Sequence, residues 1–200
     1  MHANICEFPS ETLYSSKLTS HESVASHLLD DLPNTFLDSE DAKEVLQTPI
    51  VFFDTSGCEY YERVDSTDGD EGSRCNENEA TIVSNWVDKL VSVIFGIHLS
   101  AFQRLSLFNS KITCGVLSSQ IAIITPCVTP EIGVTSNANG FIYYFRYQAQ
   151  VVLLTSLLRP KYGPELEIGT VDGMQGREKE AVVISLVRSN DVVSYLPVFF

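Results

Sequence analysis

Paired cysteines are missing from this sequence of 200 residues. Its cysteines stand singly and show no CxxC spacing, at positions Cys6, Cys58, Cys75, Cys114 and Cys127. An odd number of scattered cysteines argues against a disulfide framework and against a zinc site. We therefore expect free, mostly buried thiols and no metal bound by this chain.

Targeting and membrane signals are also missing. Residues 1–10 lack a basic region followed by an apolar core, so no secretory signal peptide is predicted. The two longest apolar stretches, 92–114 and 127–146, are interrupted by polar side chains such as Arg104 and Glu131, so neither suits a membrane span. The expected location is cytoplasmic, nuclear or both, with no membrane partner.

Basic residues are scarce: 13 Lys and Arg stand against 26 Asp and Glu, which gives a net charge of −13. This balance argues at first against a nucleic-acid partner, because phosphate contacts use Lys and Arg. However, the segment 30–79 holds nearly all of the excess, and the rest of the chain is almost neutral. Residues 65–79 (DSTDGDEGSRCNENE) are typical of a solvated or disordered acidic loop, with a specific acidic interaction site as the alternative.

Short apolar runs predict the strands. The run 50–53 ends at Asp54-Thr55-Ser56-Gly57 and predicts a buried strand that leads into a turn. The run 121–124, stopped by Thr125 and Pro126, is typical of a parallel strand covered on both faces. Further strands are expected at 166–170 and 182–187.

Helical spacing predicts two long helices between these strands. Asn76 and Glu79 have the spacing of a capping box, and apolar residues then recur at helical intervals, which predicts a helix over 77–91. A second helix is predicted by the stripe Tyr147, Val151, Leu154 and Leu158, and Pro160 is expected to end it. Alternating strands and helices favour a three-layer α/β domain around a mainly parallel sheet, with its ligand crevice at the carboxyl ends of the strands.

The segment 170–181 (TVDGMQGREKEA) places a hydroxyl, carboxylates, an amide and cations in a tight turn between two strands. Its two glycines permit the close backbone approach that phosphate or sugar binding requires. From its chemistry alone this segment is a candidate polar site. A surface loop whose Arg, Lys and Glu side chains form ion pairs remains an equal alternative.

The string TVDGMQGREKEAVVISLVRSN, from Thr170 to Asn190, resembles motif V of the superfamily-one (1B) helicases of the immunoglobulin-mu-binding and nonsense-transcript-regulator type. MHANI and FPS near the start, FFDTSGCEYYE, CNENEATIVSNWVDKLV, IAIITP and YQAQV follow in the order of that family. The resemblance implies a RecA-like (P-loop NTPase-like) fold for residues 1–190. It identifies the chain as the second RecA-like lobe of a helicase, incomplete at its C-terminus, with residues 191–200 as a tail unlike the family.

The resemblance also implies roles for individual residues. Glu178 would bind the nucleotide ribose, with Gln175 and Gly176 lining the same cleft. Thr170 and Asp172 would connect this cleft to bound nucleic acid, which Thr125 and Pro126 would also approach. Gln150 is expected to steady a local turn, and Arg188 to anchor the next motif.

Several motifs of the complete enzyme do not occur in this sequence. There is no GxxxxGK[ST] phosphate loop (Walker A), no metal-holding Walker B pair and no motif VI with its arginine finger. No catalytic residue is therefore assigned. The complete family enzyme would use ATP and Mg²⁺, with Mg²⁺ held by the missing first lobe, and we expect neither bound nor hydrolysed by this chain alone.

The apolar stretches 92–114 and 127–146 fall where the family has no residues, because deleting them restores the family text on both sides. They are interpreted as unspliced or alternatively spliced sequence, with lineage-specific loops as the alternative. Two functions stay open. The chain is either the motor lobe of an ATP-dependent 5′ to 3′ helicase, with the first RecA-like lobe and the backbone of single-stranded or duplex DNA or RNA as partners, or a non-catalytic truncated product.

Overall fold

The structure is a computed structural model that describes residues 1–37, 39–64, 73–91, 114–126 and 147–187. The chain divides into two units, Met1–Phe53 with Asn85–Ile121, and Asp54–Ser84 with Ala122–Phe200. Most of the two apparent insertions, Arg188 and the expected tail 191–200 lie outside the described residues. The first unit contains the N-terminal helices, and the second contains a parallel sheet.

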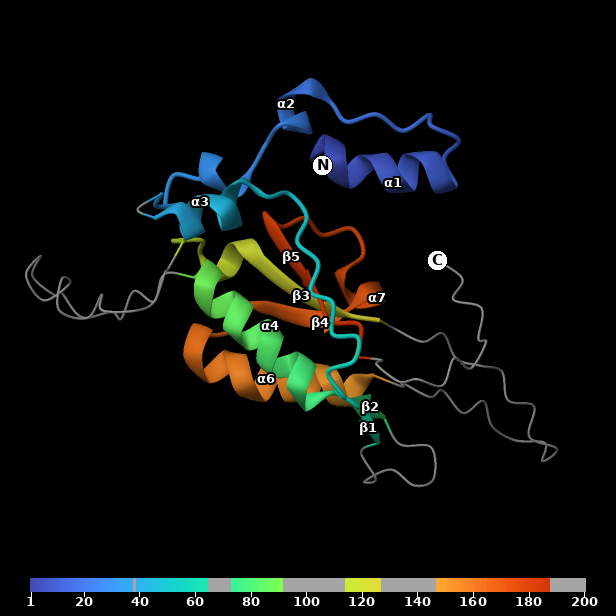
Figure 1. The fold of residues 1–200 in the computed structure, drawn as a ribbon, viewed down its shortest axis with the longest axis vertical. Helices are drawn as coiled ribbons and strands as arrows, with labels where there is room; N and C mark the ends of the chain where they lie inside the picture. The colour runs from blue at the N-terminus through green and yellow to red at the C-terminus, as the bar shows by residue number, and fades with distance from the viewer. Residues whose placement is uncertain (38, 65–72, 92–113, 127–146, 188–200) are drawn as a thin grey trace, which may run out of the picture. The chain divides into compact units, whose positions relative to one another are not determined.

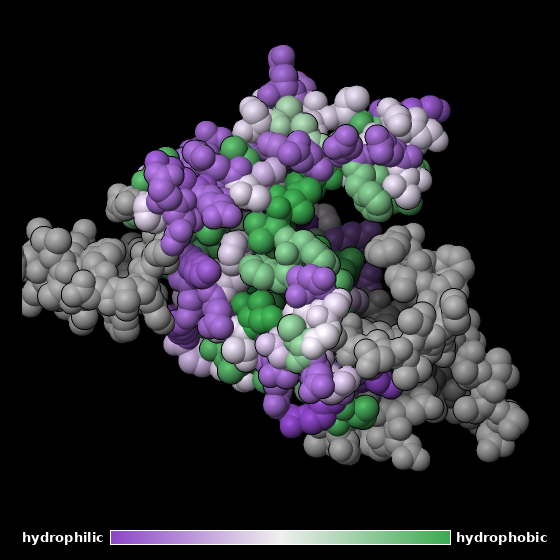
Figure 2. All heavy atoms as spheres, viewed as in Figure 1, coloured by the Kyte–Doolittle hydropathy of each residue, from purple (hydrophilic) through white to green (hydrophobic). Residues whose placement is uncertain are grey.

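Four short helices build the first unit: α1 (Ala3–Leu13), α2 (Glu22–Ala25), the 3-10 helix η1 (Leu29–Asp31) and α3 (Glu40–Gln47) (Figure 1). Side chains cap the three α-helices, as when Ser39 Oγ accepts the Ala42 N–H of α3 at 3.1 Å. η1 and α3 pack together, and the Gln47 amide donates to the Asp30 carboxylate at 2.9 Å. Figure 2 shows hydrophilic side chains gathered over this pair of helices, where part of the acidic segment lies.

The end of α4 (Glu77–Leu90) meets the segment that begins at Cys114. The Cys114 N–H donates to the Lys89 carbonyl and the Val116 N–H to the Leu90 carbonyl, both at 2.9 Å. Cys114 is fully buried and its carbonyl accepts the Phe36 N–H at 3.1 Å. Cys114, the last residue of the first apparent insertion (92–114), is therefore packed within this unit.

Gly115 follows with φ +86°, a left-handed conformation that disfavours any other residue. A Cβ at this position would lie 2.2 Å from the Asn34 carbonyl oxygen. The close approach of the two backbones thus depends on glycine. The 3-10 helix η3 (Ser118–Gln120) then leads into the sheet.

The second unit is built on a three-stranded parallel sheet of β3 (Ile121–Thr125), β4 (Glu167–Thr170) and β5 (Ala181–Ile184), in the order β4-β3-β5. The α/β class and the parallel sheet are as predicted, with the outer strands shifted by one to three residues. Consecutive residues of β3 are buried, namely Ile121, Ala122 and Ile123. Because successive side chains point to opposite faces, β3 is covered on both sides.

β5 is covered on one face only. Val182, Ile184 and Leu186 are 51%, 59% and 56% exposed, whereas the alternate residues Ala181 and Ser185 are buried. This period of two places three apolar side chains on one side of an edge strand. These three side chains are therefore largely exposed to solvent.

The helix α6 (Gln148–Tyr162) packs against β4. Its predicted stripe is confirmed, since Leu154 and Leu158 are fully buried. The prediction that Pro160 ends the helix is wrong, because the helix continues to Tyr162. Gly163 then caps it with φ +79°, and the Gly163 N–H donates to the Arg159 carbonyl at 2.9 Å. Pro160 is exposed and lies in the last turn, where its ring faces solvent and only one helical donor is lost.

Part of the expected acidic loop 65–79 forms regular secondary structure. β1 (Arg63–Val64) and β2 (Arg74–Cys75) pair antiparallel, and α4 starts directly after them. Ion pairs join Arg74 to Glu62 and Arg63 to Glu77. Only residues 65–72 of the expected loop lie outside the described chain.

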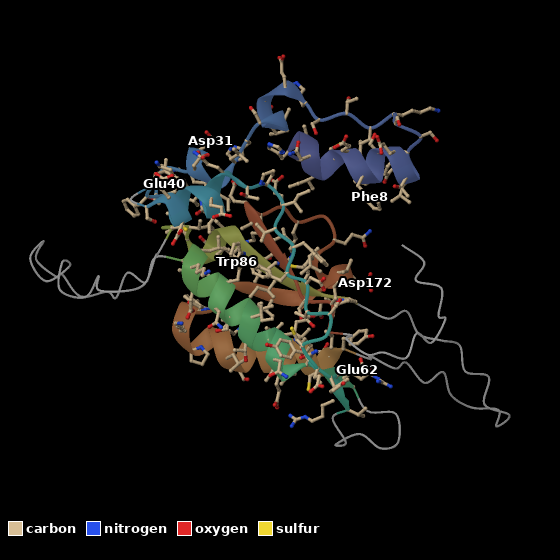
Figure 3. All side chains as sticks on the ribbon, in the orientation of Figure 1. Phe8, Asp31, Glu40, Glu62, Trp86 and Asp172 are labelled. Atoms are coloured by element: carbon tan, nitrogen blue, oxygen red, sulfur yellow. The ribbon has the colours of Figure 1, made fainter. Side chains whose placement is uncertain are left out.

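The prediction of a buried strand at 50–53 is wrong. These residues form no strand, and Phe52 is 77% exposed. Phe53 instead packs edge-on against Trp86 of α4, with ring centroids 5.0 Å apart and planes at 71°. Figure 2 shows apolar side chains on this face of the molecule, and Figure 3 labels Trp86 on α4. A short apolar run cannot by itself distinguish a strand from an irregular segment that packs on a helix.

The thiols agree with expectation where they are described, since Cys6, Cys75 and Cys114 are buried and Cys58 is exposed, all without disulfides. Burial raises the pKa of the Cys114 thiol. Among the described residues, no helix has both the length and the apolar character needed to cross a membrane.

Candidate functional site

Two threonines mark the carboxyl edge of the sheet. Thr125 is the last residue of β3 and Thr170 the last of β4, and the parallel register makes them direct partners. Paired residues of parallel strands project to the same face, so both side chains lie at one edge of one face. In parallel α/β sheets ligands bind beyond this edge.

The segment TVDGMQGREKEA starts at that edge. Thr170 begins the short helix α7 (Val171–Met174), and its hydroxyl accepts the Gly173 N–H at 3.4 Å. Asp172 is exposed in the first turn, and Figure 3 shows it beyond the end of β4. Thr170 and Asp172 therefore both lie at the strand ends, as the fold-based argument predicts.

The rest of the segment forms an exposed turn. Gln175 ends α7, and Gly176 has φ +79°, which reverses the chain in a conformation suited to glycine. Gln175, Gly176 and Glu178 are all exposed, so each is accessible to a ligand.

Arg177 and Lys179 both pair with Glu167, the first residue of β4. The Arg177 guanidinium lies 3.1 Å from one carboxylate oxygen, and the Lys179 ammonium lies 3.0 Å from the other. Hydrogen bonding and charge from Lys179 and Arg177 lower the pKa of Glu167, with the Lys179 hydrogen bond as the largest cause. Both cations are thus ion-paired, as the alternative interpretation of this loop expects, and Glu167 of β4 is a partner of each.

Thr125 differs from its expected accessibility. Its side chain is fully buried, and its hydroxyl has no hydrogen-bond partner in the part of the chain that the structure describes. Pro126, next to it, is half-buried. Direct contact between the Thr125 hydroxyl and nucleic acid therefore requires movement of the surrounding chain, whereas Thr170 needs none.

A buried polar network lies behind this edge, and its centre is Gln150. The amide oxygen of Gln150 accepts the Asn76 N–H at 2.8 Å, and its nitrogen donates to the Ser185 hydroxyl at 3.0 Å. Gln150 and Ser185 are almost fully buried. The Ser185 N–H donates to the Ile124 carbonyl at 2.9 Å, so the network reaches the residue before Thr125. Gln150 therefore does more than steady a turn: it links α6, α4 and the end of β5.

The capping box at the start of α4 is only half formed. The Asn76 side chain accepts the Glu79 N–H at 3.0 Å, as predicted. However, the Asn76 N–H binds Gln150, and the Glu79 carboxylate accepts a hydrogen bond from Ser185 at 3.0 Å instead. The sequence spacing identified the helix start, but the long-range partners Gln150 and Ser185 had no local signal.

Carboxylates, histidines and cysteines do not gather into a candidate metal site anywhere in the described ranges. Within those ranges the site is thus a sheet edge with hydroxyls, an exposed acidic turn and a cation pair held by Glu167. A parallel sheet with helices, and with polar residues on the loops at its carboxyl edge, agrees with an α/β domain of the P-loop NTPase-like kind.

Comparison with known proteins identifies the family. A sequence model described as "AAA domain" matches residues 1–129 and 140–195. The unmatched residues 130–139 lie inside the second apparent insertion. The chain belongs to this AAA domain family, among the superfamily-one helicases.

Curated relatives agree with that assignment. The chain is 37% identical over 195 residues to DNA polymerase alpha-associated DNA helicase A of Schizosaccharomyces pombe, covering 96% of this chain and 22% of the relative. It is 35% identical over 190 residues to the DNA-binding protein SMUBP-2 of Rattus norvegicus, covering 95% and 14%. It is 28% identical over 193 residues to Regulator of nonsense transcripts 1 of Dictyostelium discoideum, covering 96% and 11%. The chain therefore spans less than a quarter of the length of these relatives.

Proposed function

We propose that this chain is the second RecA-like motor lobe of an ATP-dependent 5′ to 3′ nucleic-acid helicase and that 170–181 is its motif V. The observation that carries the proposal is the register that pairs Thr125 with Thr170, because it places the start of that segment at the ligand edge of the sheet. The family membership and the printed names of the relatives, two of which include "helicase" or "DNA-binding", support it.

The exposed turn is proposed to face the nucleotide. A carboxylate accepts hydrogen bonds from the hydroxyls of a ribose, and the exposed Glu178 suits that role. Gln175 and Gly176 would line the same cleft, where Gly176 permits close approach. ATP and its Mg²⁺ would lie between this lobe and a phosphate-loop lobe, which would hold the metal because the described residues here offer no cluster of metal ligands.

The strand ends are proposed to face the nucleic acid. Thr170 and Asp172 would connect the nucleotide cleft to the DNA or RNA backbone, with Thr125 and Pro126 beside them. Contacts of this kind fix the position of a strand without reading its bases. Such contacts would suit both a relative named for DNA binding and one named for nonsense transcripts.

A hydrolysis assay tests the nucleotide part. The purified chain should release no phosphate from ATP above the buffer rate, because the phosphate loop and arginine finger are absent from its sequence. Turnover that survives repurification and is lost in Glu178→Ala would show that the chain contains a complete ATP site.

An oligonucleotide assay tests the nucleic-acid part. Thr170→Val removes the hydroxyl at nearly constant volume and should weaken binding of labelled oligothymidylate. Thr155→Val on α6 is the matched control, because Thr155 is also half-buried but lies away from the strand ends. Equal binding by both variants would contradict the assignment of Thr170.

A non-catalytic truncated product is the second candidate. The gap in the family match at 130–139 favours it. Sequencing of transcripts across both insertion junctions distinguishes the candidates. Messages that lack 92–114 and 127–146 and continue into a complete helicase would support the motor lobe, whereas a message identical to this chain would support the truncated product.

A further inference from the structure

The two cations beside Glu178 converge on one acid. Each oxygen of the Glu167 carboxylate meets a different cation, Arg177 at 3.1 Å and Lys179 at 3.0 Å. The Glu167 side chain is 27% exposed and that of Arg177 59% exposed, so solvent reaches the arrangement. A two-oxygen anion therefore already sits between these cations, and it is supplied by the chain itself.

A phosphate group would fit the same cations. Arg and Lys bind carboxylates and phosphates through the same charge-assisted hydrogen bonds, and a phosphodiester also presents two free oxygens. The other arginines near the start of α4 are engaged elsewhere, Arg63 with Glu77 and Arg74 with Glu62. The pair held by Glu167 is the one that lies in the proposed motif V.

We propose that Glu167 is an internal competitor for phosphate, which holds Arg177 and Lys179 in the free chain and yields them to a phosphate group that binds beside motif V. This inference rests on the proposed function, because it gives that motif its anion contacts. The lowered pKa of Glu167 supports it, since the competitor stays charged at neutral pH. The phosphate comes either from a nucleic-acid backbone or from a nucleotide.

The test compares two variants that change the net charge equally. Glu167→Gln removes the competing carboxylate, whereas Glu165→Gln removes an exposed carboxylate from the turn before β4. Binding of labelled oligothymidylate is measured by fluorescence anisotropy over a series of KCl concentrations. Each added phosphate contact steepens the slope of log K against log salt by about 0.7 for single strands. Because two cations would be released, the slope for Glu167→Gln should be steeper than that for Glu165→Gln by up to about 1.4.

Further variants show whether the released cations cause the gain. Adding Arg177→Gln to Glu167→Gln should remove about half of the increase in slope. Glu167→Asp keeps the charge but shortens the side chain, so it should release one cation and give an intermediate gain even if Glu167→Gln folds poorly. Circular dichroism establishes that each variant is folded before binding is measured.

These measurements distinguish failure of the competitor role of Glu167 from failure of the proposed nucleic-acid site at the strand ends. Equal slopes for Glu167→Gln and Glu165→Gln, or no gain in either, would overturn the competitor role whatever Thr170→Val does. If Thr170→Val binds oligothymidylate as well as its control while Glu167→Gln still shows the steeper salt slope, the proposed nucleic-acid site is contradicted and the competitor role is not. Competition by ADP against the oligothymidylate would assign the phosphate to a nucleotide, and binding unaffected by ADP would assign it to the nucleic-acid backbone.

Discussion

Replacing Gln150 by leucine should destabilise the fold, although the two side chains have similar volumes. Gln150 accepts the Asn76 N–H and donates to the Ser185 hydroxyl, and all three residues are almost completely buried. Leucine can do neither. The Asn76 N–H would lose the amide oxygen that it binds, at a cost of about 1–3 kcal/mol. The Ser185 hydroxyl still donates to Glu79 and would lose one bond worth about 0.5–1.5 kcal/mol, so the whole loss should be about 1.5–4.5 kcal/mol.

This loss is large beside the whole stability of a small domain, about 5–15 kcal/mol. Urea unfolding followed by far-UV circular dichroism should show a midpoint lowered by roughly 1–2 M with an unchanged slope. Gln148→Leu is the control, since Gln148 is exposed two residues earlier in the same helix. That variant should unfold within about 0.5 kcal/mol of the wild type, as surface substitutions usually do.

Two results would refute the reasoning. If Gln150→Leu and Gln148→Leu shift the midpoint equally, the network contributes nothing beyond helix propensity. If Gln150→Leu is more stable than the wild type, the desolvation of the amide outweighs its hydrogen bonds. A double-mutant cycle with Ser185→Ala then measures the coupling of that pair directly.

The remaining predictions concern pH and the core. The pKa of Glu167 is lowered in the folded chain, so its ion pairs stabilise the fold above the unfolded pKa of about 4.3, and that stability is lost as pH falls through the folded value. The difference in urea midpoint between wild type and Glu167→Gln should therefore be present at neutral pH and vanish in acid, and a difference that persists in acid would contradict the ion-pair origin. Leu158→Ala should cost about 2–5 kcal/mol because Leu158 is fully buried, while Leu157→Ala, at a half-exposed neighbour, should cost far less in the same urea measurement. Similar losses for the two leucines would contradict the observed orientation of α6.

Local patterns predicted the regular elements well where burial and propensity agree. The helix expected over 77–91 is α4, and the strand expected from 121 is β3. Apolar residues at helical spacing bury one face of a helix, and an unbroken apolar run suits a strand that is covered on both faces. Pro160 misled the prediction because the rule that proline ends a helix assumes an interior position, and Pro160 lies in an exposed last turn.

Long-range geometry could not be predicted in the same way. The run 50–53 has the composition of a strand, but no strand pairs with it, and Phe53 packs on Trp86 instead. Likewise, the sequence of the loop 177–179 does not predict that Arg177 and Lys179 both pair with Glu167. The position of β4 in the sheet decides which carboxylate lies near them. The resemblance to helicases identified the positions of the candidate site, whereas the burial of Thr125 required the fold.

The backbone pairing at the end of α4 has a practical consequence. The N–H groups of Cys114 and Val116 donate to the carbonyls of Lys89 and Leu90, so the residues on either side of 92–113 are held close together. Once two ends are held together, each doubling of the length between them costs only about 0.6 kcal/mol of closure entropy. Lengthening the chain between Val91 and Cys114 by a fluorescent reporter or an affinity handle should therefore cost little further closure entropy.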